Sequence, residues 1–187
     1  MPSIISHAVA AVALKSAFPD RAVPRRLILA GAICSMAPDI DVVAFSFGIR
    51  YEDLLGHRGL THSFAFAAVI ACLALFAACP KGSPRIHKGL VWLYLFLAAA
   101  SHCLLDAMTD GGLGVAFFAP FSNTRYFFPF RPICVCPIGA SAFMSAQGLT
   151  VLLNEILWVW LPASVFAVMA FTIRRLWPGR TRPDRLY

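Results

Sequence analysis

The residues of this sequence that could do chemistry are histidines and aspartates at short spacings. His102 and Asp106 stand four positions apart near the end of an apolar run. In a helix, that spacing puts an imidazole and a carboxylate on one face, and these two ligand types suit zinc or a similar divalent ion. Taken alone, the pair is equally compatible with two hydrogen-bonded residues at a helix end.

Two more acids follow an earlier apolar run, where Asp39 and Asp41 come directly after Pro38. Proline predicts the end of a helix after Ala37, with the chain turning at the two acids. A simple Asp turn is the alternative. However, negative charge at a helix C-terminus opposes the helix dipole, and carboxylates near hydrocarbon are costly unless they are paired or bind a metal. The pattern therefore favours ligands.

A Gly-His-Arg-Gly stretch precedes the next apolar run and adds two histidines, His57 and His62. Thr61 or Ser63 could cap the helix that follows. His57 and His62 are five positions apart and do not share a helix face, so at least one of them is expected to project from the turn. Two histidines and an arginine are more than helix capping requires.

The composition predicts that these residues lie in a membrane. Of 187 residues, 59% are hydrophobic and only 13% are charged, whereas soluble domains carry about 25% charged residues. The apolar surplus must face lipid, which predicts an all-α integral membrane bundle formed by a single domain, residues 1–187. The start of the chain does not resemble a signal peptide, because His7 and Lys15 interrupt its apolar stretch.

Five apolar segments are expected to be embedded in the membrane. Only the last is long enough to span it unaided. The segments are Ile4–Phe18, Leu27–Ala37, Ser63–Cys79, Gly89–Leu105 and Leu149–Ile173.

Basic residues orient these segments, because cytoplasmic loops of membrane proteins are enriched in Lys and Arg. Alternating passes leave Arg50, Arg58, Arg125 and Arg131 on one side. The N-terminus is then outside and the C-terminus inside, as expected for a multi-pass protein of the bacterial inner membrane with residues 174–187 as a basic cytoplasmic tail. The cytoplasmic set is Lys15, Arg21, Arg25, Arg26, Lys81, Arg85, Lys88, Arg174, Arg175, Arg180, Arg182 and Arg185.

Counted from the cytoplasmic helix ends, the polar residues within the apolar segments reach a common depth of roughly 17 to 27 Å. His7, Asp39, His62, His102 and Glu155 belong to this layer. The layer lies near the outer edge of a hydrocarbon core about 30 Å thick, which makes His7 a ligand candidate and predicts an active site facing the extracytoplasmic side. His87 falls on the opposite side.

Seven candidate ligands are more than one ion needs, so one or two divalent ions are expected. Zinc fits best, with manganese or magnesium as alternatives, and two-metal centres of this composition activate water for hydrolysis. The candidate metal ligands are His7, Asp39, Asp41, His57, His62, His102 and Asp106.

Candidate catalytic residues lie outside the ligand set. The outer loop, residues 111–147, is either an interfacial aromatic belt or a lid whose Arg125 and Arg131 clamp a phosphate together with Arg58. Glu155 is an acid inside a span and hence a functional candidate. It could act as a ligand, a general base or an arginine partner.

The cysteines and the net charge say less about function. The six cysteines form no disulfide framework, and a lone Cys134–Cys136 pair is more typical of ordinary cysteines than of a metal or redox site. The net charge of +7 comes from short basic blocks without a basic helix face, so nucleic acid is not an expected partner. Membrane lipids are.

The combined motifs resemble the YdjM-type inner-membrane family of metal-dependent hydrolases over nearly the whole chain. The resemblance implies a membrane location and a divalent metal but no substrate. It rests on Ser6-His7, Pro38 to Asp41, Gly56 to Ser63, and Ser101 to Asp106 followed by Thr109 and Gly111, with further similarity at 126–133 and 154–162.

The order of the ligands is also similar to that of zinc-dependent phospholipase C, which has a His, an Asp, a His and then His-x-x-x-Asp. The later His and Glu cluster of that family is missing here, although Glu155 could stand in for one member. This similarity implies phosphoester chemistry. We therefore expect a membrane hydrolase that cleaves a phosphoester of a phospholipid or lipid-linked phosphate by means of a metal-activated water. A metal-binding transporter and a non-catalytic membrane protein are the alternatives.

Overall fold

The computed structural model describes residues 1–79, 87–137 and 143–176. These residues form helices and irregular loops, and their only β-type pairing is two isolated bridges, Thr109 with Ile133 and Val115 with Tyr126. The helical elements are α1 (Ile4–Lys15), η1 (Arg25–Leu27), α2 (Ile28–Met36), η2 (Ala37–Phe47), η3 (Leu60–His62), α3 (Phe64–Ala78), α4 (Lys88–Ala107), α6 (Ala146–Glu155), η4 (Ile156–Trp160) and α7 (Leu161–Leu176).

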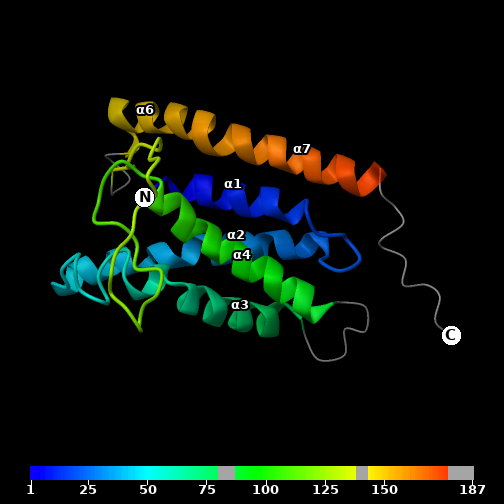
Figure 1. Ribbon diagram of the computed structural model, residues 1–187, viewed down its shortest axis with the longest axis horizontal. Coiled ribbons are helices and arrows are strands. Elements are labelled where there is room, and N and C mark those ends of the chain that lie inside the picture. The colour runs from blue at the N-terminus through cyan, green and yellow to red at the C-terminus, as the bar shows by residue number, and fades with distance from the viewer. Residues whose placement is uncertain (80–86, 138–142, 177–187) are drawn as a thin grey trace.

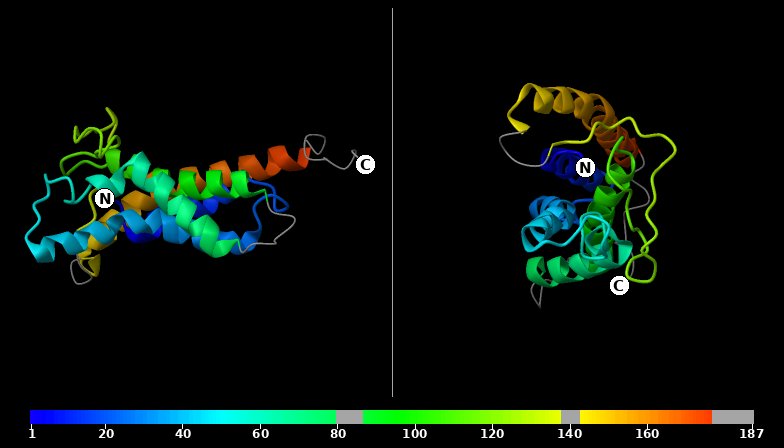
Figure 2. Two further views of the ribbon diagram at one scale, coloured as in Figure 1. Left: turned by 90° about the horizontal axis from the view of Figure 1, so that it is seen from below. Right: turned by 90° about the vertical axis from the view of Figure 1, so that its left-hand side faces the viewer.

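The helices form a bundle in which α4 is the central element (Figure 1). It crosses α1, α2 and α3 on one side, while α7 packs against the outer side of α1 (Figure 2). Val91, Tyr94 and Leu95 of α4 are fully buried. A Cβ at Gly31 of α2 would stand 2.1 Å from the Tyr94 hydroxyl, so glycine is needed there for α2 to approach α4 this closely.

The prediction of an all-α membrane bundle is confirmed, with a correction to the spans. Three helical stretches are long and apolar enough to cross a membrane, Arg25–Phe47, Lys88–Ala107 and Ala146–Leu176, whereas Ile4–Lys15 and Phe64–Ala78 are shorter. The prediction that only the last segment could span unaided is wrong. The predicted segments Leu27–Ala37 and Gly89–Leu105 belong to longer helical stretches, because the first continues through Asp39 and Asp41 and the second through Asp106.

The α-helix before Pro38 ends at Met36, one residue before the predicted end at Ala37, but the chain does not turn there as predicted. The α-helical winding stops at Met36, and the chain continues as the tighter 3₁₀ segment η2 until Gly48, whose φ of 75° terminates it. Proline fits because it occupies the start of η2, where its missing N–H costs little. Asp39 and Asp41 therefore lie on a helical segment rather than in a turn.

The last span is one continuous helical rod with a widened turn. Residues Ile156–Trp160 form a π-helical segment immediately before α7, and Pro162 follows one residue into α7. A proline removes one helical hydrogen bond, and wider winding is a common local response. No side chain of α7 is buried, as expected for a helix surrounded by lipid.

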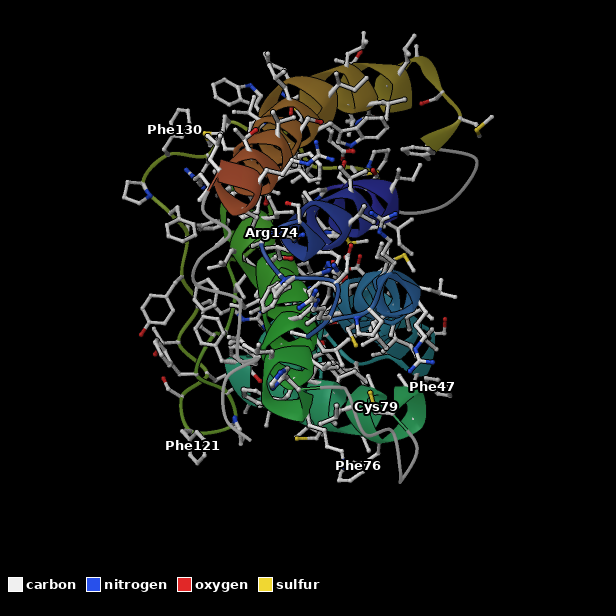
Figure 3. All side chains as sticks on the ribbon, turned by 90° about the vertical axis from the view of Figure 1, so that its right-hand side faces the viewer. Phe47, Phe76, Cys79, Phe121, Phe130 and Arg174 are labelled. Atoms are coloured by element: carbon white, nitrogen blue, oxygen red, sulfur yellow. The ribbon has the colours of Figure 1, made fainter. Side chains whose placement is uncertain are left out.

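The two ends of the bundle differ in character (Figure 1). At one end, Lys15 donates to Asp20 at 2.8 Å and Arg174 donates to the Ser16 carbonyl at 2.7 Å. Lys88 begins α4 there, next to His87. The opposite end holds η2, η3 and the long loop, whose Phe121 and Phe130 point outward at the periphery (Figure 3). The predicted basic residues Lys81, Arg85, Arg180, Arg182 and Arg185 lie outside the described residues, as do 138–142 of the predicted lid.

Candidate metal centre

Four ligand-type side chains from three segments converge at the end of the bundle opposite the basic residues. Asp39, His62, His102 and Asp106 each offer an atom within 4.8 Å of the others. His102 Nε2 lies 3.3 Å from Asp39 Oδ1 and 3.0 Å from His62 Nε2. His62 Nε2 lies 3.4 Å from Asp106 Oδ2. We call these four residues the inner group.

His7 of α1 lies against the inner group. Its Nε2 atom is 3.6 Å from Asp106 Oδ1, and its ring stacks on His102 with the centroids 3.7 Å apart. The side chain is fully buried, and neither ring nitrogen has a hydrogen-bond partner among residues 1–79, 87–137 and 143–176. His7 is therefore placed as a further donor to the same centre.

The tautomer of His102 follows from its partner. Its Nδ1 atom lies 2.7 Å from the Ser35 carbonyl oxygen. Because a carbonyl only accepts, Nδ1 must carry the proton and Nε2 must present its lone pair to the inner group. The Ser35 carbonyl is available because Pro38, three residues later in the 3₁₀ winding, has no N–H to donate to it.

Asp41 belongs to a second group, which it forms with His57 and His62. His57 Nδ1 lies 2.6 Å from Asp41 Oδ1. The other oxygen, Oδ2, accepts from the Arg58 N–H and the Thr61 hydroxyl and lies 3.1 Å from His62 Nδ1. Its carboxylate is thus already satisfied by protein donors.

His62 links the two groups through its two ring nitrogens. Nδ1 faces Asp41, while Nε2 faces the inner group. A carboxylate that accepts from the rear nitrogen of a histidine is the usual arrangement behind a metal ligand, since it fixes the ring and raises its basicity. In this geometry Asp41 supports His62 rather than facing the inner group.

The inner group has the unmet electrostatic need that a cation would satisfy. Both oxygens of Asp39 and of Asp106 are buried and accept no hydrogen bond from any residue that the structure describes. With neutral imidazoles, Asp39, Asp41 and Asp106 plus buried Arg58 carry a formal charge of −2. Buried carboxylates of this kind are costly unless they are neutralised, so the donor set and the charge both fit one divalent ion.

The raised pKa of His62 also indicates that the inner group requires positive charge. Burial by itself would lower the pKa of His62, but contacts with Asp106, Asp39 and Asp41 outweigh it and raise that pKa to about 10. The raised pKa means that the three surrounding carboxylates favour a positive charge at this imidazole. A metal ion bound at Nε2 would replace that positive charge.

Arg58 is buried, forms an ion pair through Nε and donates hydrogen bonds through both terminal nitrogens. Its Nε atom lies 2.9 Å from Asp106 Oδ2, and its two terminal nitrogens donate to the Gly111 carbonyl and the Thr109 hydroxyl, both at 3.0 Å. Its φ of 63° is rare for a residue with a side chain. A Cβ at the neighbouring Gly56 would lie 2.1 Å from a backbone oxygen. The turn thus aims Arg58 at Asp106, and clamping a phosphate would require Arg58 to leave these partners.

The other two predicted arginines lie apart from the inner group. Arg125 donates to the carbonyl oxygens of His57, Tyr51 and Asp53 at 2.9 to 3.2 Å. Its guanidinium therefore braces the loop that carries His57. Arg131 is exposed, with its guanidinium 4.7 Å from the centre of the Phe127 ring. Their predicted role in holding phosphate stays a prediction.

Glu155 sits beside the start of α1 rather than in the inner group. Its carboxylate accepts from the Ser3 N–H and hydroxyl and from the Ser6 hydroxyl, the last at 2.6 Å. Trp160 donates to the same Ser6 oxygen at 2.8 Å. A carboxylate at a helix N-terminus is favourable, so the contacts give Glu155 a capping role next to His7. Its predicted roles as ligand or base stay predictions.

Sequence reasoning missed the small hydroxyl residues that position the ligands. Ser35 donates to the His7 carbonyl at 2.7 Å while its own carbonyl accepts from His102, so it joins three helices. Thr61 donates to Asp41. The available signal was a serine one helical turn before Asp39 in an otherwise apolar run, a position from which it must face the neighbouring helices.

Together the fold and this cluster define a helical membrane protein with buried histidines and aspartates that could hold a metal ion. The chain belongs to the family described as YdjM inner membrane protein, which matches residues 1–178. It is 38% identical to the inner membrane protein YbcI of Escherichia coli (strain K12) over 177 residues, covering 94% of this chain and all of that protein. No solved structure gives a significant match. The chain is thus a bacterial inner-membrane protein.

Proposed function

We propose that this protein is a membrane-bound, metal-dependent hydrolase that cleaves a phosphoester of a phospholipid or lipid-linked phosphate. One observation carries the proposal. Asp39 and Asp106 are buried beside three imidazoles, and their oxygens accept no hydrogen bond in the described parts of the chain, although Asp106 Oδ2 forms an ion pair with Arg58 Nε. A purely structural polar cluster would be expected to satisfy these oxygens internally.

The inner group, with His7, would hold one divalent ion, most simply zinc. Such an ion would lower the pKa of a bound water and polarise a phosphoryl oxygen. Asp41 keeps the His62 ring in place, and the Ser35 carbonyl does the same for His102. Arg58 offsets part of the negative charge by pairing with Asp106.

We assign His57 a proton-transfer role instead of the ligand role expected from sequence. Its Nδ1 atom is 2.6 Å from Asp41, so Nε2 is the ring nitrogen that could exchange a proton with substrate. No hydrogen bond to Nε2 comes from a residue that the structure describes. A histidine held by a carboxylate at one nitrogen can accept or donate a proton at the other.

Several features support a substrate that comes from the lipid. Large apolar side chains are exposed at the same end of the bundle, including Ile40 and Phe47 on η2 and Phe121 on the loop. Lys15, Lys88 and Arg174 lie at the opposite end, and this group of basic residues favours an extracytoplasmic location for the centre. The phosphoester class rests on the similarity of the ligand order to zinc-dependent phospholipase C.

The test compares Asp39→Asn with Glu52→Gln, since Glu52 is an exposed acid outside the cluster. Purified proteins are loaded with zinc, and bound metal is measured by elemental analysis. Hydrolysis is then assayed on vesicles that contain a phospholipid or an isoprenoid phosphate. We expect about one bound ion and turnover for wild type and Glu52→Gln, and loss of both for Asp39→Asn.

Two outcomes would count against the proposal. Wild-type protein that binds no metal after loading would remove its basis. Bound metal without turnover of any phosphoester, together with zinc flux in proteoliposomes, would instead favour a metal transporter.

A further inference from the structure

A second candidate site lies on a part of the molecule that the metal centre does not use. A groove with a volume of about 700 Å³ runs between α2 and α3. Its floor is made of small or buried side chains, and Leu29, Ile33 and Leu73 form an exposed apolar rim. The volume falls within the range of about 300–1,000 Å³ that is typical of ligand sites.

The groove exists because α4 fills only one side of the α2–α3 pair (Figure 2). On the other side, the groove is lined by small side chains from both helices, Ala30 of α2 and Ala74 and Ala78 of α3. The opening is therefore lateral, towards the surroundings of the bundle. In a chain that spans a membrane, those surroundings are lipid.

One end of the groove carries an arginine without a protein partner. Arg26 of η1 lines the groove and is exposed. Throughout the described residues, no side chain or carbonyl pairs with its guanidinium. Arg25 beside it is different, since its Nε lies 3.3 Å from Asp20. An unpaired cation at the mouth of an apolar groove is complementary to an anionic headgroup attached to an acyl chain.

The length of the groove matches one leaflet. The wall formed by η1 and α2 runs from Arg26 to Cys34, and these eight residue-to-residue steps correspond to about 12 Å of helix rise. Half of a hydrocarbon core about 30 Å thick is similar. An acyl chain in the groove would make dispersion contacts with these small side chains. Basic pockets between transmembrane helices bind anionic lipids on the same grounds.

We propose that the α2–α3 groove binds one anionic phospholipid from the leaflet at the basic end of the bundle, with an acyl chain along Ala30 and Ala74 and the phosphate on Arg26. The inner end of the groove is Cys34, the neighbour of Ser35, which contacts both His7 and His102. Bound lipid would thus hold α2 at the turn that positions the metal centre. The site itself does not depend on the proposed hydrolase activity.

The experiment measures phospholipid retained by the detergent-purified protein, by native mass spectrometry, and its thermal stability with added phosphatidylglycerol or phosphatidylcholine. Ala74→Leu fills the groove, and Arg26→Gln removes its cation. Arg25→Gln is the matched control for charge. Thr172→Leu, at an exposed position on α7, is the control for added bulk.

We expect wild type and both controls to retain one phospholipid and to be stabilised more by phosphatidylglycerol than by phosphatidylcholine. Arg26→Gln should bind phosphatidylglycerol about fivefold more weakly, the factor expected for one charge near a membrane surface. Ala74→Leu should lose the retained lipid.

Equal stabilisation of wild type by the two lipids would overturn the proposal, as would an Arg26→Gln protein that keeps the preference for phosphatidylglycerol. A dimer of the wild type that Ala74→Leu converts to a monomer, with lipid retention unchanged, would show that a second copy of the chain covers the groove instead.

Discussion

Asp41 holds the histidines of the candidate metal centre in place and does not face the inner group. Its two oxygens are surrounded by donors from the Gly-His-Arg-Gly turn and η3, including His57 Nδ1 at 2.6 Å and His62 Nδ1 at 3.1 Å. Asp39, two residues earlier, has no hydrogen-bond donor in the described chain. Asp39 and Asp41 therefore have different roles. Asp39 offers free lone pairs, and Asp41 fixes two imidazole rings.

This difference predicts distinct outcomes for two matched substitutions. Asp39→Asn should abolish metal binding because it removes a charged ligand. Asp41→Asn should weaken metal affinity by about 10–100-fold, the usual effect of losing an outer-shell partner, because the His62 ring loses its support. Calorimetric zinc titration of metal-stripped protein measures both. Equal loss of affinity in the two variants would argue that Asp41 is itself a ligand.

At the scale of elements, the junction of α2 and η2 determines the orientation of the ligands. The winding tightens at Ala37, just before Pro38. In a 3₁₀ segment each residue turns the chain by about 120° instead of about 100°, which changes the directions of Asp39 and Asp41. The same proline leaves the Ser35 carbonyl for His102.

Pro38→Ala should therefore separate stability from metal binding. Alanine restores an N–H that competes for the Ser35 carbonyl, and it allows η2 to relax towards regular α-helix. Thermal stability in detergent is expected to be unchanged or higher, because proline disfavours helix interiors, whereas zinc affinity should fall by up to about tenfold. Zinc affinity at the wild-type level would show that the proline has no part in aligning the centre.

At the scale of the molecule, the two ends of the bundle carry different kinds of residue. The ligands, the buried Arg58 and the aromatic loop lie at one end, and the paired basic residues around Lys15 and Arg174 lie at the other. Since Lys and Arg concentrate on the cytoplasmic side of membrane proteins, this polarity predicts that the metal centre faces the extracytoplasmic side.

Labelling of single cysteines in intact spheroplasts tests this orientation. In a background where Cys72→Ser and Cys134→Ser remove the more accessible native thiols, Glu52→Cys marks the ligand end and Ala17→Cys marks the basic end, both at exposed positions. A membrane-impermeant maleimide should label Glu52→Cys in intact cells and Ala17→Cys only after lysis. The reverse pattern would place the centre on the cytoplasmic side.

Removal of metal should destabilise the whole bundle, because the inner group and His7 together join α1, η2, η3 and α4. Metal at a hundredfold excess over its dissociation constant contributes about 2.7 kcal/mol to folding stability. A chelator should therefore lower Tm by about 5–10 °C, and added zinc should restore it. Asp39→Asn is the control for effects of the chelator itself, because a variant that binds no metal should keep its Tm when chelator is added. A wild-type Tm that is insensitive to both treatments would contradict a bound structural or catalytic ion.

The membrane environment and the approximate helices could be predicted from the amino-acid sequence, because both follow from local properties. Apolar runs with little charge must face lipid, and their limits agree with the observed helices to within a few residues, as for Ser63–Cys79 and α3 (Phe64–Ala78). The common depth of His7, Asp39, His62 and His102 also followed from counting along helices. These four side chains do meet.

The contacts between individual aspartate and histidine atoms could be read only from the folded structure. The same residue type has oxygens without hydrogen bonds at Asp39 and supports two imidazole rings at Asp41, and that distinction depends on donors supplied from distant parts of the chain. Glu155 shares the depth of the cluster, yet its contacts run to Ser3 and Ser6. Spacing along a helix fixes height and face, but the pairing of side chains between helices depends on how closely the helices pack. That packing is controlled by positions such as Gly31, whose role becomes evident only when Tyr94 lies against it.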